Sequence, residues 1–468
     1  MKNILFLFLA VLIFTSANAQ TRKPATTSQP SWQKLYIIKD KRYISQGNDR
    51  VFFWLGDTAW ELFHRLSREE ADLYLKNRAD KGFNVIQAVA LAEFDGLTQP
   101  NAYGHLPLVN NDPTQPNEAY FKHVDYIIDK AAQYNMFVGL LPTWGDKFNK
   151  KWGVGPEIFT PENARIYGEF LGKRYKNKNV IWILGGDRSP ENEAHYKIIR
   201  AMAEGLKAGD GGTRLMTYHP TGDSNSAAFF HQDSWLNFNM FQSGHGTRDK
   251  KNYVFTRQNH YLFPVKPTID GEPRYEDHPI DWKPQQGYFD DFDARQAAWW
   301  SVLAGAGGHT YGCHDIWQFF DPNRNPPVSF ARTHWKRAMD LPGAYQMGYL
   351  RRLMDSHPWW RMMPEQRIIK NANPEDGGYQ MAAISEDMNF LIAYTPHGKP
   401  LQIDLSMLTA APRLLAYWYN PRDGVSIKIG ELKNEGTVEF KPYAAGPGTD
   451  WVLVLDDPTQ SWAGFGLK

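Results

Sequence analysis

The sequence has almost no cysteine and no excess of charge of either sign. Cys313 is the single cysteine among 468 residues, which excludes a disulfide within the chain and a zinc site built on several cysteines. Lysine and arginine total 52 and aspartate and glutamate total 51, giving a net charge of +1. This balance lacks the positive field that nucleic-acid binding uses. We therefore expect no nucleic-acid partner, no metal and no cofactor.

Long hydrophobic runs are also missing, except at the N-terminus. The stretch from Ile4 to Phe14 is apolar, follows Lys2 and is too short to span a bilayer comfortably. The small residues Ala17 and Ala19 then predict a signal peptide over residues 1–19, cleaved before Gln20, and residues 20–30 form a polar, flexible lead-in. A secreted chain without disulfides fits a bacterial periplasm, and we expect a monomer without a membrane span.

Aromatic residues, in contrast, make up 14% of the chain, with 17 tryptophans and 23 tyrosines. From about residue 50, short apolar runs alternate with amphipathic segments such as Ser67–Lys81, which opens with a capping-box pattern. This alternation predicts a parallel sheet covered by helices, here a (β/α)8 TIM barrel over residues 31–365. An open doubly wound sheet is the alternative, but no glycine-rich phosphate loop follows the first strand. The expected strands are Val51–Leu55, Asn84–Leu91, Met136–Leu141, Asn179–Leu184, Arg214–Tyr218, Trp235–Phe241, Pro267–Ile269 and Ser301–Tyr311.

The pattern changes after about residue 366. Seven short, alternating segments separated by Gly, Pro, Asn and Asp occupy the remaining residues, 366–468. Such spacing predicts a small antiparallel β-sandwich, which we interpret as an accessory domain packed on the barrel.

Reactive groups in a barrel gather at the C-terminal ends of the strands. The residues at the predicted strand ends are mainly carboxylates, amides, imidazoles and tryptophans, with no nucleophile-elbow serine. In chain order they include Trp54, Asp57, Trp60, Glu61, Gln87, Glu93, Trp144, Asp146, Asp187, Arg188, His219, Asn239, Gln242, His245, Asp270, Glu272, His309, Tyr311, His314 and Trp317. Carboxylates beside indole rings are typical of enzymes that hydrolyse glycosidic bonds.

Two of these carboxylates stand out by position. Asp187 follows the fourth predicted strand and two glycines, and Glu272 follows the seventh strand and Gly271. Glycine at such a turn lets the backbone bend sharply beside a reactive side chain. The fourth and seventh strands face each other across a barrel mouth. The alternative for Asp187 is an ion pair with Arg188 or a cap of the next helix, and for Glu272 it is an ion pair with Arg274.

Four motifs of the barrel region together resemble the apiosidase-like glycoside hydrolases, glycoside hydrolase family 140. The segment around Leu415-Ala-Tyr-Trp-Tyr-Asn-Pro-Arg-Asp-Gly is similar to the small β-domain that follows the barrel in that family, a module that some catalogues describe as collagen-binding. The four barrel motifs are Phe53-Trp-Leu-Gly-Asp-Thr-Ala-Trp-Glu-Leu, Ile181-Trp-Ile-Leu-Gly-Gly-Asp-Arg, Thr268-Ile-Asp-Gly-Glu-Pro and Gly307-Gly-His-Thr-Tyr-Gly.

The resemblance implies a retaining apiosidase that acts on the plant pectin rhamnogalacturonan II, with Asp187 as acid/base and Glu272 as nucleophile. Many members of the wider clan of retaining barrel hydrolases carry Asn-Glu at strand four, whereas this chain has Gly186-Asp187 there. Another strand end, for example Gln242 or His219, would then bind the sugar 2-hydroxyl. Double displacement requires carboxyl groups about 5–5.5 Å apart.

The other candidates are expected to bind substrate. They are Asp57, Trp60, Gln87, Trp144, Arg188, His219, Gln242, His245, Arg274, His309, Tyr311 and Trp317, with Trp54 a further aromatic candidate. Three alternatives stay open: a retaining glycosidase for another plant glycan such as an arabinofuranoside or β-glucan, a non-catalytic glycan-binding protein, and a matrix adhesin. We expect Cys313 to be a small buried residue rather than a redox group.

Overall fold

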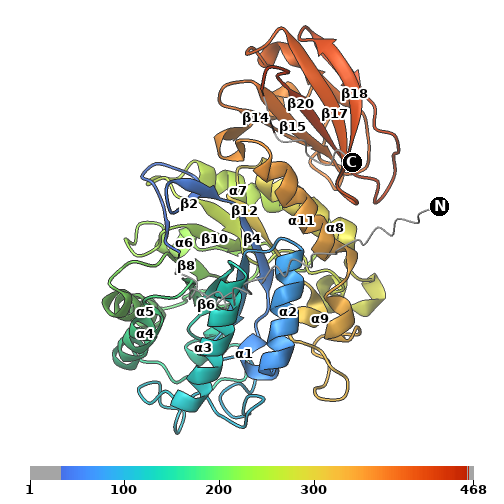
Figure 1. Ribbon diagram of the computed structural model, residues 1–468. Helices are drawn as coiled ribbons and strands as arrows, with labels where there is room; N and C mark the ends of the chain where they lie inside the picture. Colours follow the sequence, from blue (N-terminus) through green and yellow to red (C-terminus); the bar gives the residue numbers. More distant parts are fainter. Residues whose placement is uncertain (1–32, 461, 463–468) are drawn as a thin grey trace, which may run out of the picture. The chain divides into compact units, whose positions relative to one another are not determined.

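The computed structural model describes residues 33–460 and 462, so the predicted signal peptide and the whole predicted lead-in lie outside the described residues. Eight parallel strands form a barrel, as predicted (Figure 1). The ladder runs from β8 through β4 to β10, and the gap between β8 and β10 is closed by hydrogen bonds such as Asn237 N–H to the Met216 carbonyl at 2.8 Å. The strands are β4 Trp54–Thr58, β5 Val85–Val89, β6 Phe137–Leu141, β7 Val180–Gly185, β8 Met216–His219, β10 Asn239–Gln242, β11 Thr268–Asp270 and β12 Gly308–Tyr311, with β9 Ser224–Asn225 added antiparallel to β10.

All eight predicted barrel strands differ from the structure by at least one residue, and three of them differ most. Val51–Leu55 is divided between β3 Arg50–Phe52 and β4, and the sixth strand begins only at Asn239. The last prediction, Ser301–Tyr311, began too early because Ser301 belongs to the end of α8 Asp291–Leu303. Gly305, at φ 101°, lies in the turn that separates this helix from β12.

The helices between the strands follow the predicted amphipathic segments. Ser67 caps α2 with the predicted capping box, in which Glu70 N–H donates to Ser67 Oγ at 3.3 Å and Ser67 N–H donates to Glu70 Oε2 at 3.1 Å. The helices are α1 Leu62–Arg65, α2 Arg68–Asp80, α3 Glu118–Gln133, α4 Pro161–Tyr175, α5 Glu193–Asp210, α6 Ala227–Phe230, α7 Asn252–His260, α8 Asp291–Leu303, α9 His314–Trp317, α10 Trp335–Ala338 and α11 Pro342–Asp355.

Alternation along the strands divides the barrel core into two layers. Ile181 and Ile183 of β7 belong to the inner cluster, whereas Trp182 packs outward under the helices. Trp54 is also fully buried in the inner cluster, where its Nε1 donates to Thr310 Oγ1 at 3.0 Å. A small antiparallel sheet of β1 Leu35–Tyr36, β2 Ile44–Gln46 and β3 Arg50–Phe52 adds apolar side chains to the inner cluster.

The C-terminal region forms a six-stranded antiparallel sheet and a two-stranded one. The first sheet has the order β13-β14-β15-β20-β17-β18 and begins at Met362, a few residues before residue 366. Alternate residues of β15 face different clusters: Ile392 packs into the core shared with the barrel helices, and Leu391 faces the second sheet. The strands are β13 Met362–Pro364, β14 Met381–Ser385, β15 Phe390–Thr395, β16 Leu401–Asp404, β17 Arg413–Asn420, β18 Val425–Lys433, β19 Thr437–Phe440 and β20 Trp451–Asp456.

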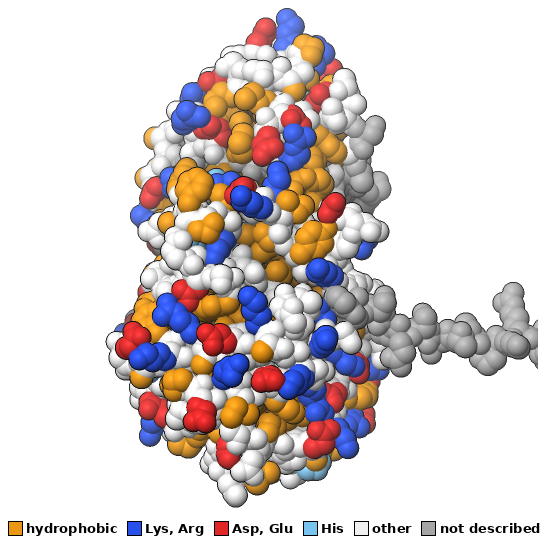
Figure 2. All heavy atoms as spheres, turned by 90° about the vertical axis from the view of Figure 1, so that its left-hand side faces the viewer, with side chains coloured by type: hydrophobic (Ala, Val, Ile, Leu, Met, Phe, Trp, Pro, Cys, Tyr) orange, Lys and Arg blue, Asp and Glu red, His pale blue; other side chains and the backbone are white. Residues whose placement is uncertain are grey.

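The surface agrees with the balanced charge of the sequence. In Figure 2, acidic and basic side chains are interspersed over the visible face, and neither sign gathers in a wide region. None of the helices in the described part of the chain combines the length and apolar character needed to cross a membrane. Cys313 is fully buried, as predicted.

Candidate active site

A cavity of about 440 Å³ lies at the C-terminal ends of the barrel strands and contains both candidate carboxylates. Its walls combine aromatic rings with a few carboxylates, amides and imidazoles, the composition expected of a sugar-binding site. The lining residues are Trp60, Glu93, Phe94, Trp144, Trp152, Asp187, Thr221, Gly222, Gln242, Gly244, His245, Glu272, Tyr275, His278, Trp282, His314, Trp317, Val328 and Ser329.

Asp187 reaches this cavity through an unusual turn at the end of β7. Gly185, Gly186 and Asp187 have consecutive positive φ angles of 93°, 99° and 54°. A Cβ on Gly185 would lie 2.3 Å from the His219 carbonyl oxygen, so no larger residue fits there. The non-glycine residue in the left-handed region is Asp187 itself, whose N–H donates to His219 Nδ1 at 3.1 Å. The turn therefore determines where the Asp187 side chain lies in the cavity.

The surroundings of Asp187 favour its protonated form. Its side chain is 20% exposed, and Oδ2 lies 3.0 Å from Nη1 of the buried Arg188. Burial, followed by the negative charge of Glu272, raises the pKa of Asp187 to about 6, although the positive charge of Arg188 opposes this shift. A carboxyl group with this pKa is suited to donate a proton and later to accept one.

Glu272 is held in the opposite state. Its Oε1 lies 3.0 Å from His245 Nε2, and its Oε2 lies 3.0 Å from His219 Nε2. Burial alone would raise the pKa of Glu272, but hydrogen bonding to His219 and His245 opposes this and lowers it to about 2. Two carboxyl groups in one cavity thus have pKa values shifted in opposite directions, which separates an acid from an ionised nucleophile.

His219 connects the two carboxylates. Its Nδ1 accepts the Asp187 N–H, so the ring proton resides on Nε2, next to Glu272. The ring lies in contact with Trp60, at a centroid distance of 5.4 Å, and with Trp144 at 6.1 Å. His219 is therefore held in one orientation by the backbone N–H of Asp187 and by the rings of Trp60 and Trp144.

These pKa values predict how activity depends on pH. If Asp187 is the general acid, as expected from the sequence, it has to be protonated to donate to the leaving oxygen, and kcat/KM should fall as the pH rises through about 6. Glu272 is ionised above about pH 2, so it imposes no limit in the neutral range. A pH profile of kcat/KM checks this expectation. In Asp187→Ala, assayed with an activated aryl glycoside, the fall above pH 6 should vanish; its persistence would assign the alkaline limb to another group.

Further predicted residues line the aromatic wall of the cavity. Trp60 packs on Trp144 at a centroid distance of 5.3 Å and donates from Nε1 to Tyr275 Oη at 3.0 Å. Trp317 donates from Nε1 to His314 Nδ1 at 3.2 Å. Gln242 also lines the cavity. These bonds hold the indole rings in place before any sugar enters.

Two predicted residues lie in the outer layer of the barrel instead. Asp57 is fully buried, with Oδ2 2.5 Å from Arg78 Nε and 2.6 Å from Tyr74 Oη, both on α2. Tyr311 donates to Glu276 Oε2 at 2.5 Å. Neighbouring residues of a strand point to opposite sides, and these two point away from the cavity. Their side chains join strands to the surrounding elements rather than facing substrate.

Three other predicted residues lie behind the cavity wall. Gln87 donates from Nε2 to the Gly271 carbonyl at 2.8 Å, directly before Glu272 in sequence. Arg274 donates from Nη1 to Gln296 Oε1 at 2.9 Å, on α8. His309 is 1% exposed, and burial lowers its pKa to about 3. Gln87 supports the turn that carries Glu272, whereas Arg274 and His309 belong to the packing under α8.

The structure also brings residues into the cavity that the sequence interpretation did not select. Trp152 and Trp282 lie on loops well beyond the ends of β6 and β11 and are 63% and 50% exposed. Glu93 was noted at a strand end but not chosen, and His278 was not noted. Trp152 and Trp282 lie too far from the strands to be selected as strand-end residues. Tryptophan in a polar loop is the sequence feature that could have indicated them. Within the described residues, no cluster of three or more His, Cys, Asp or Glu side chains is arranged to hold a metal.

The barrel and its pair of oppositely shifted carboxylates in an aromatic cavity define a glycoside hydrolase. Comparison with known families agrees, and the chain belongs to the apiosidase-like family, whose catalytic-domain model matches residues 38–361. A second model, described as "Putative collagen-binding domain of a collagenase", matches residues 363–456.

Solved structures give the same class. One described as a glycoside hydrolase is 32% identical, with a TM-score of 0.84 over 92% of this chain and 98% of its own. Another, described as a family 5 glycoside hydrolase from Bacteroides vulgatus ATCC 8482, is also 32% identical, with a TM-score of 0.85 over 93% of this chain and 96% of its own. The comparison with curated proteins finds no relative.

Proposed function

We propose that this glycoside hydrolase is a retaining enzyme that cleaves apiosyl linkages in rhamnogalacturonan II. The observation that carries the mechanism is the opposite shift of the two carboxyl groups, with the pKa of Asp187 raised to about 6 and that of Glu272 lowered to about 2. The apiosidase-like family match over residues 38–361 supports the apiosyl substrate.

The proposed reaction proceeds in two displacements. Asp187 donates its proton to the glycosidic oxygen while Glu272 attacks the anomeric carbon, which releases the leaving group and forms a glycosyl-enzyme. Asp187, now ionised, accepts a proton from water as the water attacks the anomeric carbon and frees Glu272. His219 and His245 hold Glu272 ionised and oriented for the attack. Arg188, next to Asp187, limits how far the pKa of the acid rises.

Product analysis tests both parts of the proposal. Rhamnogalacturonan II is digested with the wild type and with Glu272→Gln, alongside an arabinan and a β-glucan. The wild type should release a fragment ending in apiose from the pectin alone, first formed with the anomeric configuration of the substrate as followed by proton NMR. Release from arabinan or β-glucan instead would assign the enzyme to that glycan. A product of inverted anomeric configuration would exclude double displacement. If no substrate is cleaved, the non-catalytic glycan-binding alternative gains support.

We also propose that the enzyme acts after export to the periplasm. The support is the sequence pattern at residues 1–19, outside the described residues. N-terminal sequencing of the mature protein should give Gln20 as the first residue. A mature chain that retains Lys2 would contradict export by cleavage.

A further inference from the structure

Two exposed tryptophans stand out in a cavity whose other indole rings are buried. Trp152 is 63% exposed, whereas Trp60 and Trp144 are 2% and 3% exposed. Exposed aromatic rings that line a cavity are side chains on which a bound ligand can pack. Trp152 lies on the loop after β6 and Trp282 on the loop after β11, so they belong to different sides of the site.

Trp152 belongs to the side of the acid. The guanidinium carbon of Arg188 lies 4.0 Å from the centroid of the Trp152 ring, and the same guanidinium contacts Asp187. The ring centroid of Trp282, in contrast, lies 5.9 Å from that of His245, which contacts Glu272. In a double displacement the acid meets the leaving oxygen and the nucleophile attacks from the opposite face. The leaving group is therefore expected on the Asp187 side of the cavity, next to Trp152.

The loop that carries Trp152 is held in place before substrate arrives. Lys147 and Asp146 form a buried ion pair at the start of this loop, with Lys147 Nζ 2.8 Å from Asp146 Oδ1. Asp146 Oδ2 also accepts the Gly155 N–H at 2.8 Å. A Cβ on Gly153 would lie 2.3 Å from the Asp146 Cβ and 2.9 Å from Arg188 Nη2, so the loop packs directly on these two side chains. An indole fixed in this way loses little entropy when a ligand packs on it.

Glu93 lies in the same cavity, and its carboxyl group is unpaired in the described part of the chain. Within residues 33–460, its carboxyl group makes no hydrogen bond or ion pair with another side chain or the backbone. Burial, then the negative charges of Asp187, Glu61 and Asp146, raise the pKa of Glu93 well above its ordinary value, with Arg188 opposing. The unpaired Glu93 carboxyl therefore lines the cavity where a ligand hydroxyl can meet it, and a raised pKa favours the form that can donate a hydrogen bond.

We infer that Trp152 and Glu93 form the subsite for the leaving group, which is a sugar ring that stacks a C–H face on the indole and accepts a hydrogen bond from the Glu93 carboxyl. This inference rests on the proposed function, because it requires that Asp187 protonates the leaving oxygen. Neither residue touches the reacting bond, so both are specificity residues rather than catalytic ones.

Two substrates that share the apiosyl group separate this subsite from the chemistry. One is a rhamnogalacturonan II oligosaccharide, whose leaving group is a sugar, and the other is an aryl apioside, whose leaving group is a small phenol. The measured quantity is the ratio of kcat/KM on the oligosaccharide to kcat/KM on the aryl apioside. Trp152→Ala should lower this ratio roughly tenfold or more, as expected for removing a tryptophan on which the ligand packs. Trp360→Ala, which removes a partly exposed indole outside the cavity, should leave the ratio unchanged.

Glu93 is tested with two substitutions. Glu93→Gln keeps a donor of the same size and should retain most of the wild-type ratio, whereas Glu93→Ala should lower it. Equal losses in the two variants would overturn the assignment of Glu93 as a donor, and an unchanged ratio in both Trp152→Ala and Glu93→Ala would overturn the subsite while the proposed function stands. A wild type that hydrolyses neither apiosyl substrate would overturn the proposed function, and the inference with it.

Discussion

Replacing Glu272 by Gln should lower kcat/KM on every substrate by at least about 10⁴-fold, a loss typical of removing a nucleophile. The amide is nearly the same size as the carboxylate, so the fold survives, but it is a poor nucleophile toward the anomeric carbon. Its partners make the loss sharper, because His219 Nε2 and His245 Nε2 lie 3.0 Å from two carboxylate oxygens and an amide offers only one. Steady-state kinetics, with circular dichroism to verify the fold, measures the effect.

Azide separates the roles of the two carboxylates. In Glu272→Gly, azide should enter the space left by the side chain and give a glycosyl azide of inverted configuration. In Asp187→Gly, hydrolysis of an aryl apioside should lose much less than hydrolysis of the oligosaccharide, because a phenol leaves without an acid, and azide should give a product of retained configuration. The opposite pattern of configurations would exchange the two roles.

A matched control comes from the element that follows β7. Glu193, the first residue of α5, has a side chain 73% exposed and lies outside the cavity. Glu193→Gln makes the same chemical change as Glu272→Gln without touching the site, so its kcat/KM should equal that of the wild type. Residual activity above a few per cent in Glu272→Gln would remove Glu272 as the nucleophile.

The sequence allowed the two carboxylates to be selected because of backbone signals. Gly185 and Gly186 precede Asp187, and Gly271 precedes Glu272, at the ends of strands with continuous apolar runs. A strand buried on both faces and a glycine turn are local properties, so they are readable without coordinates. The barrel order followed from the same periodicity.

The direction of each side chain was not readable in this way. Asp57 and Trp60 lie close together at one strand end, yet Asp57 pairs with Arg78 under the helices and Trp60 lines the cavity. His219 and His245 were predicted to bind hydroxyl groups, and the structure places both on Glu272. A shift of one residue at a strand end moves a side chain from the barrel interior to the side of the helices. Where the strand passes into a loop, the sequence does not indicate which of the two sides a residue faces.

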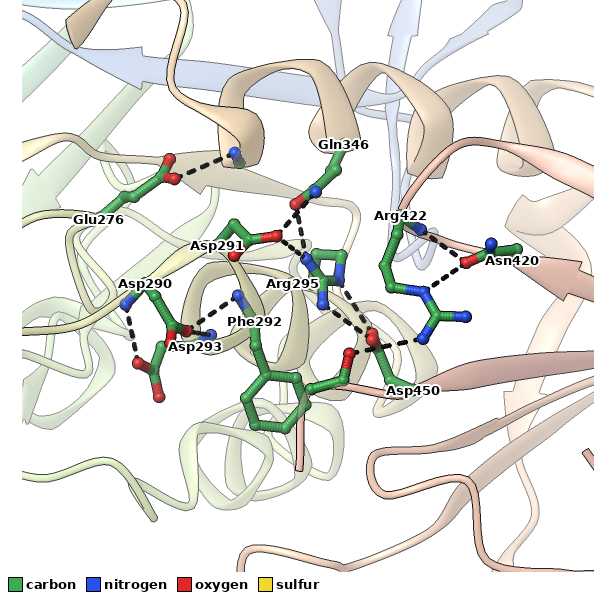
Figure 3. Close-up of polar contacts among 12 residues, drawn as sticks. Glu276, Asp290, Asp291, Phe292, Asp293, Arg295, Gln346, Asn420, Arg422 and Asp450 are labelled. Carbon is green, nitrogen blue, oxygen red and sulfur yellow. Dashed lines mark hydrogen bonds and ion pairs between the residues drawn. The ribbon is translucent and has the colours of Figure 1, made fainter. Parts of the chain in front are cut away.

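The junction between the barrel and the C-terminal sheets is polar as well as apolar. Trp299 of α8 stacks on Tyr394 of β15 at a centroid distance of 5.9 Å. Beside them Arg295 of α8 donates to both carboxylate oxygens of Asp450, at 3.0 and 2.8 Å, and the two side chains are 2% and 0% exposed (Figure 3). Asp450 Oδ2 also accepts the Tyr394 hydroxyl at 3.0 Å. This bidentate pair joins the domains in a buried environment.

We therefore expect Asp450→Asn to lower the free energy of unfolding by about 3 kcal/mol, because it leaves the Arg295 guanidinium buried without its main carboxylate. Asp291, 34% exposed, still contacts Arg295 and limits the loss. Urea unfolding followed by tryptophan fluorescence measures the change. Pairing Asp450→Asn with Arg295→Met should recover part of the loss, since removing both partners costs less than stranding one charge.

The control for this prediction is an ion pair on the surface of the C-terminal region. Lys441 and Glu439 lie 3.0 Å apart, with side chains 73% and 40% exposed. Glu439→Gln should change the free energy of unfolding by less than about 0.5 kcal/mol. If Asp450→Asn proves no more destabilising than Glu439→Gln, the buried pair does not hold the domains together, and the apolar contacts of α8 carry the junction. A loss in the single variant that the double variant partly restores would instead assign the coupling to Arg295 and Asp450.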